Sequence, residues 1–169
     1  MKQATALGTG KYERLLERCL SLEPVPTAIA YPCEATALTG AVEAAEKKLI
    51  APILVGPVDK IAETARAAGI DLGNLEVVDA PNSIAAAAKA VALIREGRAE
   101  VLMKGSLHTD ELLSAVVARD GGLRTGRRIS HVFIMPIILT SRADSVRSRI
   151  ASGAVANLVA HARRHHPGM

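Results

Sequence analysis

Residues able to bind an anion follow directly on a short apolar run in the stretch VLMKGSLHTDELL. They are Lys104, Gly105, Ser106, His108 and Thr109. The lysine offers a cation, the glycine permits close backbone approach, and the others offer hydroxyl and imidazole groups at a predicted helix start, where backbone N–H groups favour a phosphate. The glycine spacing of a P-loop is missing. Alternatively, the glycine makes a turn, Ser106 or Thr109 caps the helix, and the lysine is a solvated charge.

A second group of cations precedes the longest apolar run of the chain. Arg124, Arg127 and Arg128 lie in the stretch GLRTGRRIS. A forked guanidinium suits a phosphate group, because its donors can meet two phosphate oxygens at once. These arginines are therefore candidate anion ligands, and a turn in which they are only solvated is the alternative.

Ser141, Arg142 and Asp144 follow that apolar run, in the stretch TSRADS. The serine and the aspartate have the three-residue offset of a capping box, so a role in starting the last helix would be sufficient to explain them. In a catalytic interpretation, Arg142 holds an anion or polarises a carbonyl and Asp144 acts as a general base. Both interpretations place these residues at the N-terminus of a helix.

The histidines have no metal-ligand spacing, and the sequence predicts no metal site. His108 is the one histidine expected between a strand and a helix start, and it is the histidine to test as an acid or base. His131 lies within the long apolar run, where a core or near-core position is expected. His161, His165 and His166 are expected in a mobile terminal tail.

Composition favours an α/β protein. Aromatic residues make up 2% of the chain, so the core must be packed from small and branched aliphatic side chains, as in parallel sheets covered by helices. Cys19 and Cys33 have neither a metal-ligand nor a disulfide pattern, and they are expected to be buried thiols in a reducing cytoplasm.

Charge and hydropathy argue against two classes of partner. The net charge of +4 permits an anionic ligand, but the chain lacks aromatic residues for base stacking and any nucleic-acid motif, so no nucleic acid is expected. The N-terminal stretch has no apolar signal-peptide core, and the longest apolar run is too short to span a bilayer as a helix. We therefore expect no membrane association and a cytoplasmic location.

Short aliphatic runs alternate with Ala-rich helical patterns along the chain. Strands are predicted at PTAIAYP, APILVG, LEVVDA and EVLMKG, with a fifth beginning at Ile129. Helices are predicted from Tyr12 to Leu20, from Glu34 to Lys48, from Pro57 to Gly69, over SIAAAAKAVALIRE after a cap at Asn82 or Ser83, and over DELLSAVVA. The last helix has an apolar stripe of Val146, Ile150, Ala154 and Leu158.

Crossovers of this length require parallel strands, and right-handed crossovers place helices on both faces of the sheet. The predicted fold is a single α/β domain over residues 1–169: a three-layer, doubly wound, mainly parallel sheet of about five strands, closed by a long C-terminal helix. Every strand-to-helix turn then opens onto one edge of the sheet, which we call the rim. YPCE, GP, APNS, KGSLHT and TSRADS lie there, and a ligand is expected at the rim.

The run VLMKGSLHTDELLSAVV, followed by GLRTGRRISHVFIM, resembles the phosphate acetyl/butyryltransferase family. GAVEAAEKKLIAPILVGPVDKI is similar to that family's N-terminal region, and PIILTSRADSVRSRIAS to its C-terminal end. The resemblance implies reversible transfer of an acetyl or butyryl group between coenzyme A and inorganic phosphate, without a metal or covalent cofactor. It also implies a homo-oligomer, usually a dimer, whose substrates meet in a cleft between two domains.

By the same resemblance, Ser141 and Arg142 match a Ser-Arg pair that binds and polarises the reacting groups, and KGSLHT matches a segment that lines the cleft. A carboxylate assists deprotonation of the phosphate, a role that falls to Asp144 in this sequence. The acetyl-specific branch has its catalytic aspartate further into the helix, near the position of Ser148.

In the family, a second α/β domain separates two segments that meet here near Met135 and Pro136. Residues 1–135 resemble the N-terminal domain and residues 136–169 the C-terminal end. The chain thus resembles a shortened form without the middle domain, which contributes much of the coenzyme A side of the cleft. Two functions are open: a phosphate acyltransferase, or a non-catalytic module from that family that binds an anion or coenzyme A, or self-associates.

Overall fold

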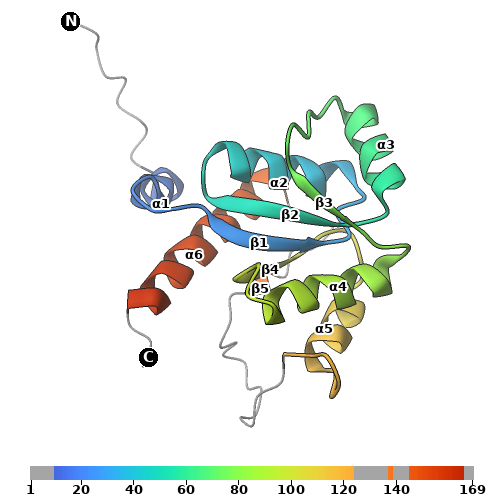
Figure 1. Cartoon of the computed structure of the whole chain (residues 1–169). Coiled ribbons are helices and arrows are strands. Elements are labelled where there is room, and N and C mark those ends of the chain that lie inside the picture. Colours follow the sequence, from blue (N-terminus) through green and yellow to red (C-terminus); the bar gives the residue numbers. More distant parts are fainter. Residues whose placement is uncertain (1–9, 124–136, 139–144, 166–169) are drawn as a thin grey trace, which may run out of the picture.

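The computed structural model describes residues 10–123, 137–138 and 145–165. At its centre is a five-stranded sheet in the order β3-β2-β1-β4-β5, in which all neighbouring strands run parallel (Figure 1). The strands are β1 (Val25–Ala30), β2 (Ile50–Gly56), β3 (Glu76–Asp79), β4 (Val101–Lys104) and β5 (Ile137–Ile138). The predicted doubly wound, parallel α/β sheet is confirmed.

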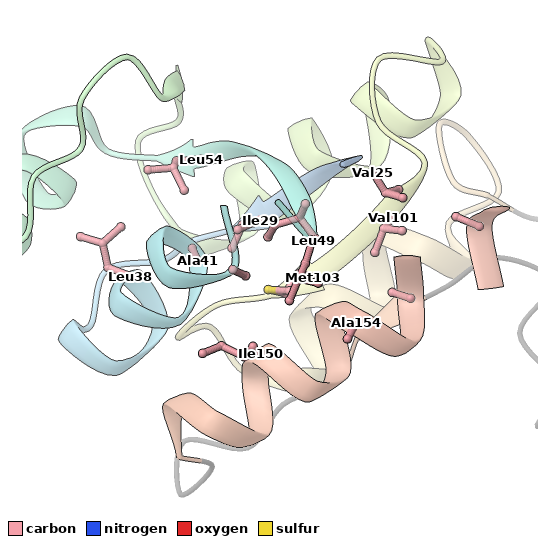
Figure 2. Packing of buried hydrophobic residues seen from close by; sticks show 14 of the residues in the cluster. Val25, Ile29, Leu38, Ala41, Leu49, Leu54, Val101, Met103, Ile150 and Ala154 are labelled. Atoms are coloured by element: carbon pink, nitrogen blue, oxygen red, sulfur yellow. The ribbon is translucent and has the colours of Figure 1, made fainter. Parts of the chain in front are cut away.

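Helices cover both faces of the sheet. They are α1 (Lys11–Cys19), α2 (Ala35–Glu46), α3 (Val58–Ala68), α4 (Ser83–Arg95), α5 (Thr109–Val117) and α6 (Val146–His165). A buried cluster joins α1, α2, α3 and α6 to one face, and Figure 2 shows Leu38 of α2 and Ile150 of α6 beside Ile29 and Met103 of the sheet. A second cluster joins α4 and α5 to the other face. The predicted aliphatic core and three layers are therefore present.

The described part of the fifth strand lies later in the chain than the predicted start at Ile129. Ile137 and Ile138 pair in parallel with Leu102 and Met103 of β4. The segment from Ile129 to Met135, including His131 and the junction expected near Pro136, lies outside the described residues. Because β5 is parallel to β4, the carboxyl end of β5 is at the same edge of the sheet as the KGSLHT turn.

Two helices begin or end at residues that the sequence predicts as caps. The Asn82 side chain accepts a hydrogen bond of 2.9 Å from the backbone N–H of Ala85 and caps α4. Gly69 has a φ of 66° and ends α3 in the left-handed conformation. The predicted capping box of Ser141 and Asp144 lies outside the described residues; in the described part, α6 starts at Val146, and the Ser145 hydroxyl accepts a hydrogen bond from the backbone N–H of Ser148 at 3.2 Å.

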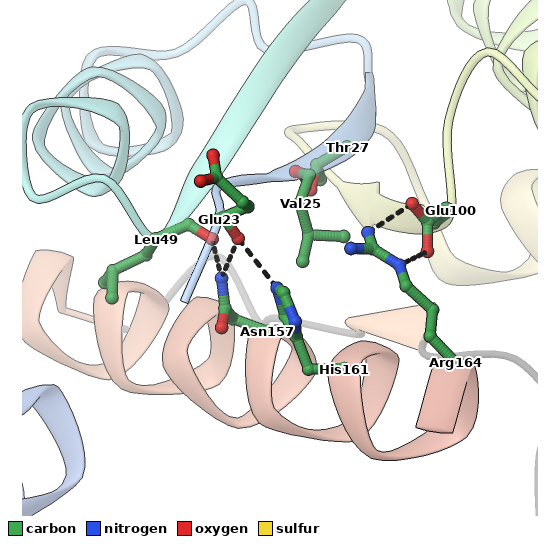
Figure 3. A network of polar contacts seen from close by, with 8 residues as sticks. All are labelled: Glu23, Val25, Thr27, Leu49, Glu100, Asn157, His161 and Arg164. Carbon is green, nitrogen blue, oxygen red and sulfur yellow. Dashed lines mark hydrogen bonds and ion pairs between the residues drawn. The ribbon is translucent and has the colours of Figure 1, made fainter. Parts of the chain in front are cut away.

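The C-terminal half of α6 is fixed to the edge of the sheet where strands begin (Figure 3). The Asn157 side-chain amide donates to the Leu49 carbonyl at 2.7 Å and to the Glu23 carbonyl at 3.1 Å, and His161 contacts the Glu23 carbonyl at 2.9 Å. His161 and His165 therefore belong to α6, and their expected place in a mobile tail is wrong. His166 lies outside the described residues.

An ion pair of Arg164 with Glu100, just before β4, continues this network. A helix of 20 residues is about 30 Å long. Because its C-terminal half meets the strand starts, α6 runs antiparallel to the strands, and its N-terminus points toward the rim.

Replacing Asn157 is expected to loosen α6 from the sheet. The residue is fully buried, so Asn157→Ala should lower the free energy of unfolding by about 2 kcal/mol through two lost hydrogen bonds and a cavity. Asn157→Asp should cost more than the alanine variant, since it faces the same two carbonyls with an acceptor. Urea denaturation measures both, and an aspartate variant as stable as wild type would contradict the assigned bonds. Val159→Ala, on the exposed side of α6, is the control.

Candidate functional site

The chain order of the strands reverses direction between β1 and β4. From β1 the sheet continues through β2 and β3 on one side, and through β4 and β5 on the other. In doubly wound sheets, ligands bind outside the carboxyl ends of the strands at such a switch point. Here residues 31–34 follow β1 and residues 105–108 follow β4. Two of the predicted rim segments, YPCE and KGSLHT, therefore meet at the switch point.

Gly105 brings the backbone of these two segments into direct contact. Its N–H donates to the Ala30 carbonyl at 2.9 Å. A Cβ atom at this position would lie 2.5 Å from the carbonyl oxygens of both Ala30 and Tyr31, so only glycine fits. The close approach predicted at Gly105 is present, and the partner is the β1–α2 turn of the same chain.

Ser106 is buried, and its hydroxyl links the same two segments. Ser106 Oγ donates to the Tyr31 carbonyl at 2.7 Å and accepts from the Cys33 N–H at 3.0 Å. Its backbone N–H also donates to the Tyr31 carbonyl, at 2.8 Å. Ser106 is therefore not the cap of α5, and its hydroxyl bonds to the neighbouring turn.

Lys104 is the last residue of β4, and 3% of its surface is exposed. Its interpretation as a solvated charge is wrong. A buried ammonium group is costly unless it meets polar or charged groups. Lys104 thus places a cation inside the protein where the strand order reverses.

His108 and Thr109 stand at the exposed start of α5, on the side of the loop away from the core. His108 occupies the cap position, and Thr109 is the first helical residue, so Thr109 is not the cap. The His108 N–H donates to Glu111 Oε2 at 2.8 Å, and the Ser83 hydroxyl of α4 donates to Glu111 Oε1 at 2.7 Å. Glu111 therefore ties the starts of α4 and α5 together at the rim.

Glu111 should make stability depend on pH. The hydrogen bond from Ser83, followed by the one from the His108 backbone, holds the pKa of this carboxyl below its ordinary value of 4.5. Its stabilising effect is thus present above that value and lost as pH falls through the lower pKa of the folded protein. We expect Glu111→Gln to lower the urea midpoint near neutral pH and to approach wild type at about pH 3. An equal difference at both pH values would contradict this role.

Tyr31 and Cys33 belong to the predicted rim segment YPCE, but neither they nor Lys60 were predicted as site residues. Tyr31 has a φ of 55°, which is rare for a bulky side chain, and it precedes a proline, which normally favours extended backbone. The Lys60 ammonium group donates to the Tyr31 hydroxyl at 3.0 Å and lies 5.2 Å from the centre of its ring. Burial raises the pKa of the Cys33 thiol to about 11, so the thiol is protonated at neutral pH.

The remaining predicted site residues fall outside the described part of the chain. They are Arg124, Arg127, Arg128, Ser141, Arg142 and Asp144. Ser141, Arg142 and Asp144 come between the end of β5 and the start of α6, which both belong to the rim edge of the sheet, whereas the three arginines come between Leu123 and Ile137. The placement of these candidates thus remains a prediction from the sequence.

Within residues 10–123, 137–138 and 145–165, no three His, Cys, Asp or Glu side chains gather in a way that could hold a metal ion. Over the same ranges, none of the helices combines the length and the apolar character needed to cross a membrane.

Comparison with known proteins identifies the family. The chain is 59% identical over 127 residues to a phosphate acetyltransferase of Rhizobium meliloti, in a match that covers 75% of this chain and 40% of that relative. The chain belongs to the phosphate acetyl- and butyryltransferase family. A phosphate butyryltransferase of Clostridium acetobutylicum is 33% identical over 123 residues, which are 73% of this chain and 41% of that relative.

The fold agrees with this family. A phosphotransacetylase from Streptococcus pyogenes superposes with a TM-score of 0.54 at 12% identity, over 63% of this chain and 40% of that structure. No protein-family model matches the chain. The chain spans about 40% of the length of the family members that it matches.

Proposed function

We propose that this protein is a phosphate acyltransferase that moves an acetyl or butyryl group between coenzyme A and inorganic phosphate. The observation that carries the proposal is the 59% identity to a phosphate acetyltransferase over 127 residues. The site agrees with it, because the buried cation of Lys104 and the exposed start of α5 lie at the switch point, where an anionic substrate would meet them.

In the proposed reaction, a phosphate oxygen attacks the thioester carbonyl. A carbon–oxygen bond forms, the carbon–sulfur bond breaks, and coenzyme A leaves as the thiol with the proton released by the phosphate. Lys104, with Arg124, Arg127 and Arg128, would attract and hold the phosphate. Ser141 and Arg142 would polarise the carbonyl, and Asp144 would accept the proton. Ser148, near which the acetyl branch has its aspartate, is exposed and carries no carboxylate.

No metal ion or covalent cofactor is required in this scheme, since the thioester is already activated. Holding two reactants in place can contribute about 7–11 kcal/mol to catalysis. We propose that the protein forms a cytoplasmic homodimer, as the resemblance to the family implies.

The test is release of free coenzyme A from acetyl- and butyryl-coenzyme A with phosphate, followed with a thiol reagent. We expect release by wild type, and a loss of about a hundredfold in Arg142→Ala. Arg98→Ala is the control, because Arg98 is exposed, pairs with Glu76 and lies before β4, at the opposite edge from the rim.

Absence of release at high protein concentration would contradict the enzymatic proposal. Binding of phosphate or coenzyme A without release, measured by calorimetry, would instead favour the non-catalytic module.

A further inference from the structure

The Tyr31 carbonyl lies in the turn after β1, at the rim, and accepts three hydrogen bonds. It accepts hydrogen bonds from the Cys33 N–H at 2.9 Å, from the Ser106 N–H at 2.8 Å and from the Ser106 hydroxyl at 2.7 Å. The Tyr31 N–H donates to the Val55 carbonyl of β2 at 2.7 Å. The turn is therefore held from both neighbouring strands.

These hydrogen bonds hold the Tyr31 backbone in the left-handed region, at a φ of 55°. Left-handed backbone is unfavourable for an aromatic residue and persists only where the surroundings enforce it. Ser106 supplies two of the three donors to the Tyr31 carbonyl, and it also bonds the Cys33 N–H. Such enforced conformations cluster at binding and catalytic sites.

The side chain of Tyr31 holds Lys60, which lies in the first turn of α3 at the carboxyl end of β2. The ammonium group bonds the phenol oxygen at 3.0 Å and lies over the ring face at 5.2 Å from its centre. Lys60 itself is exposed, so its charge faces solvent at the rim.

We propose that Lys60 is an anion-recognition residue of this site, and that Tyr31 and Ser106 are positioning residues that hold it at the rim. The inference rests on the proposed function for the identity of the anion, the phosphate substrate. In this arrangement the Ser106 hydroxyl fixes the Tyr31 turn, the phenol fixes the ammonium group, and the ammonium group attracts the anion.

The first experiment tests whether Ser106 fixes the turn. Cys33 lies in the turn and is buried, so iodoacetamide reaches its thiol mainly when the turn opens. In Ser106→Ala we expect Cys33 to react about tenfold faster, because both the Tyr31 carbonyl and the Cys33 N–H lose a partner. Cys19, buried between α1 and α6, should react as in wild type. Ser114→Ala, at an exposed serine of α5, is the control. An unchanged Cys33 rate would overturn this step.

The second experiment tests whether Tyr31 acts through Lys60, by calorimetric titration with inorganic phosphate at low salt. Lys60→Ala should weaken binding about fivefold, and Tyr31→Phe, which keeps the ring, should weaken it less. The double variant should bind like Lys60→Ala alone. The control is Lys47→Ala, which removes one lysine charge at the C-terminal end of α2, away from the rim. If Ser106→Ala unfolds and exposes both cysteines, the phosphate titration of the Lys60 and Tyr31 variants still tests the proposal.

The outcomes separate this inference from the proposed function. Phosphate binding that depends on Lys60, without release of coenzyme A, would support the inference and contradict the enzyme. Release of coenzyme A by wild type, together with unchanged phosphate binding in Lys60→Ala, would support the enzymatic proposal and contradict the inference about Lys60. The inference is also overturned if wild type binds no phosphate, or if Tyr31→Phe weakens binding equally with and without Lys60.

Discussion

Gly105→Ala is expected to lower the free energy of unfolding by about 3 kcal/mol or more. The added Cβ would lie 2.5 Å from the Ala30 and Tyr31 carbonyl oxygens and 2.7 Å from the Tyr31 carbonyl carbon. These are backbone atoms, so they cannot rotate away as a side chain would. Relief requires β4 and its turn to separate from β1, and that breaks the hydrogen bond from the Gly105 N–H to Ala30.

A second glycine gives a matched control of opposite sign. In Gly153→Ala the new methyl group would meet Ile50 and Ala44 at 3.8 and 3.9 Å, which are ordinary contacts. Because Gly153 lies inside α6, alanine should raise stability by about 0.5–1 kcal/mol. Urea denaturation of both variants measures the two effects. A Gly105→Ala variant within 1 kcal/mol of wild type would show that the two turns need not touch.

The sequence predicts correctly the strands, helices and helix ends that depend on residues a few positions apart. Strand and helix alternate with regular aliphatic spacing, and Asn82 and Gly69 sit at helix ends for reasons that act within a few residues. Once the crossovers are known to be parallel, the rim follows from topology. This is why the sequence alone predicts that YPCE and KGSLHT lie at one edge of the sheet.

The sequence-based predictions were wrong where a side chain bonds to a residue that is distant in the sequence. Ser106 looked like a helix cap, but its hydroxyl bonds residues more than 70 positions earlier in the chain. His161 looked like part of a tail, but its ring meets the Glu23 carbonyl across the sheet edge. The Tyr31 turn had no local signal at all, since a residue before proline normally favours extended backbone. Contacts of this kind depend on tertiary packing, which periodicity does not encode.

Lys104→Met should separate the role of Lys104 in binding from its role in folding. Lys104 is buried and interacts with neighbouring groups, and removing one partner of a buried charged interaction costs about 3–5 kcal/mol. We therefore expect the variant to lose about that much free energy of unfolding. Phosphate should also bind about tenfold to a hundredfold more weakly, because a charged hydrogen-bond donor contributes about 1.5–3 kcal/mol.

The measurements are urea denaturation and calorimetric titration with inorganic phosphate, with Lys47→Met as the matched loss of an exposed charge far from the rim. A loss of stability with unchanged phosphate affinity would make Lys104 a structural cation and contradict its role in binding. The expected pattern, a loss of both stability and phosphate affinity, would mean that the buried charge at the switch point serves the fold and the anion site together.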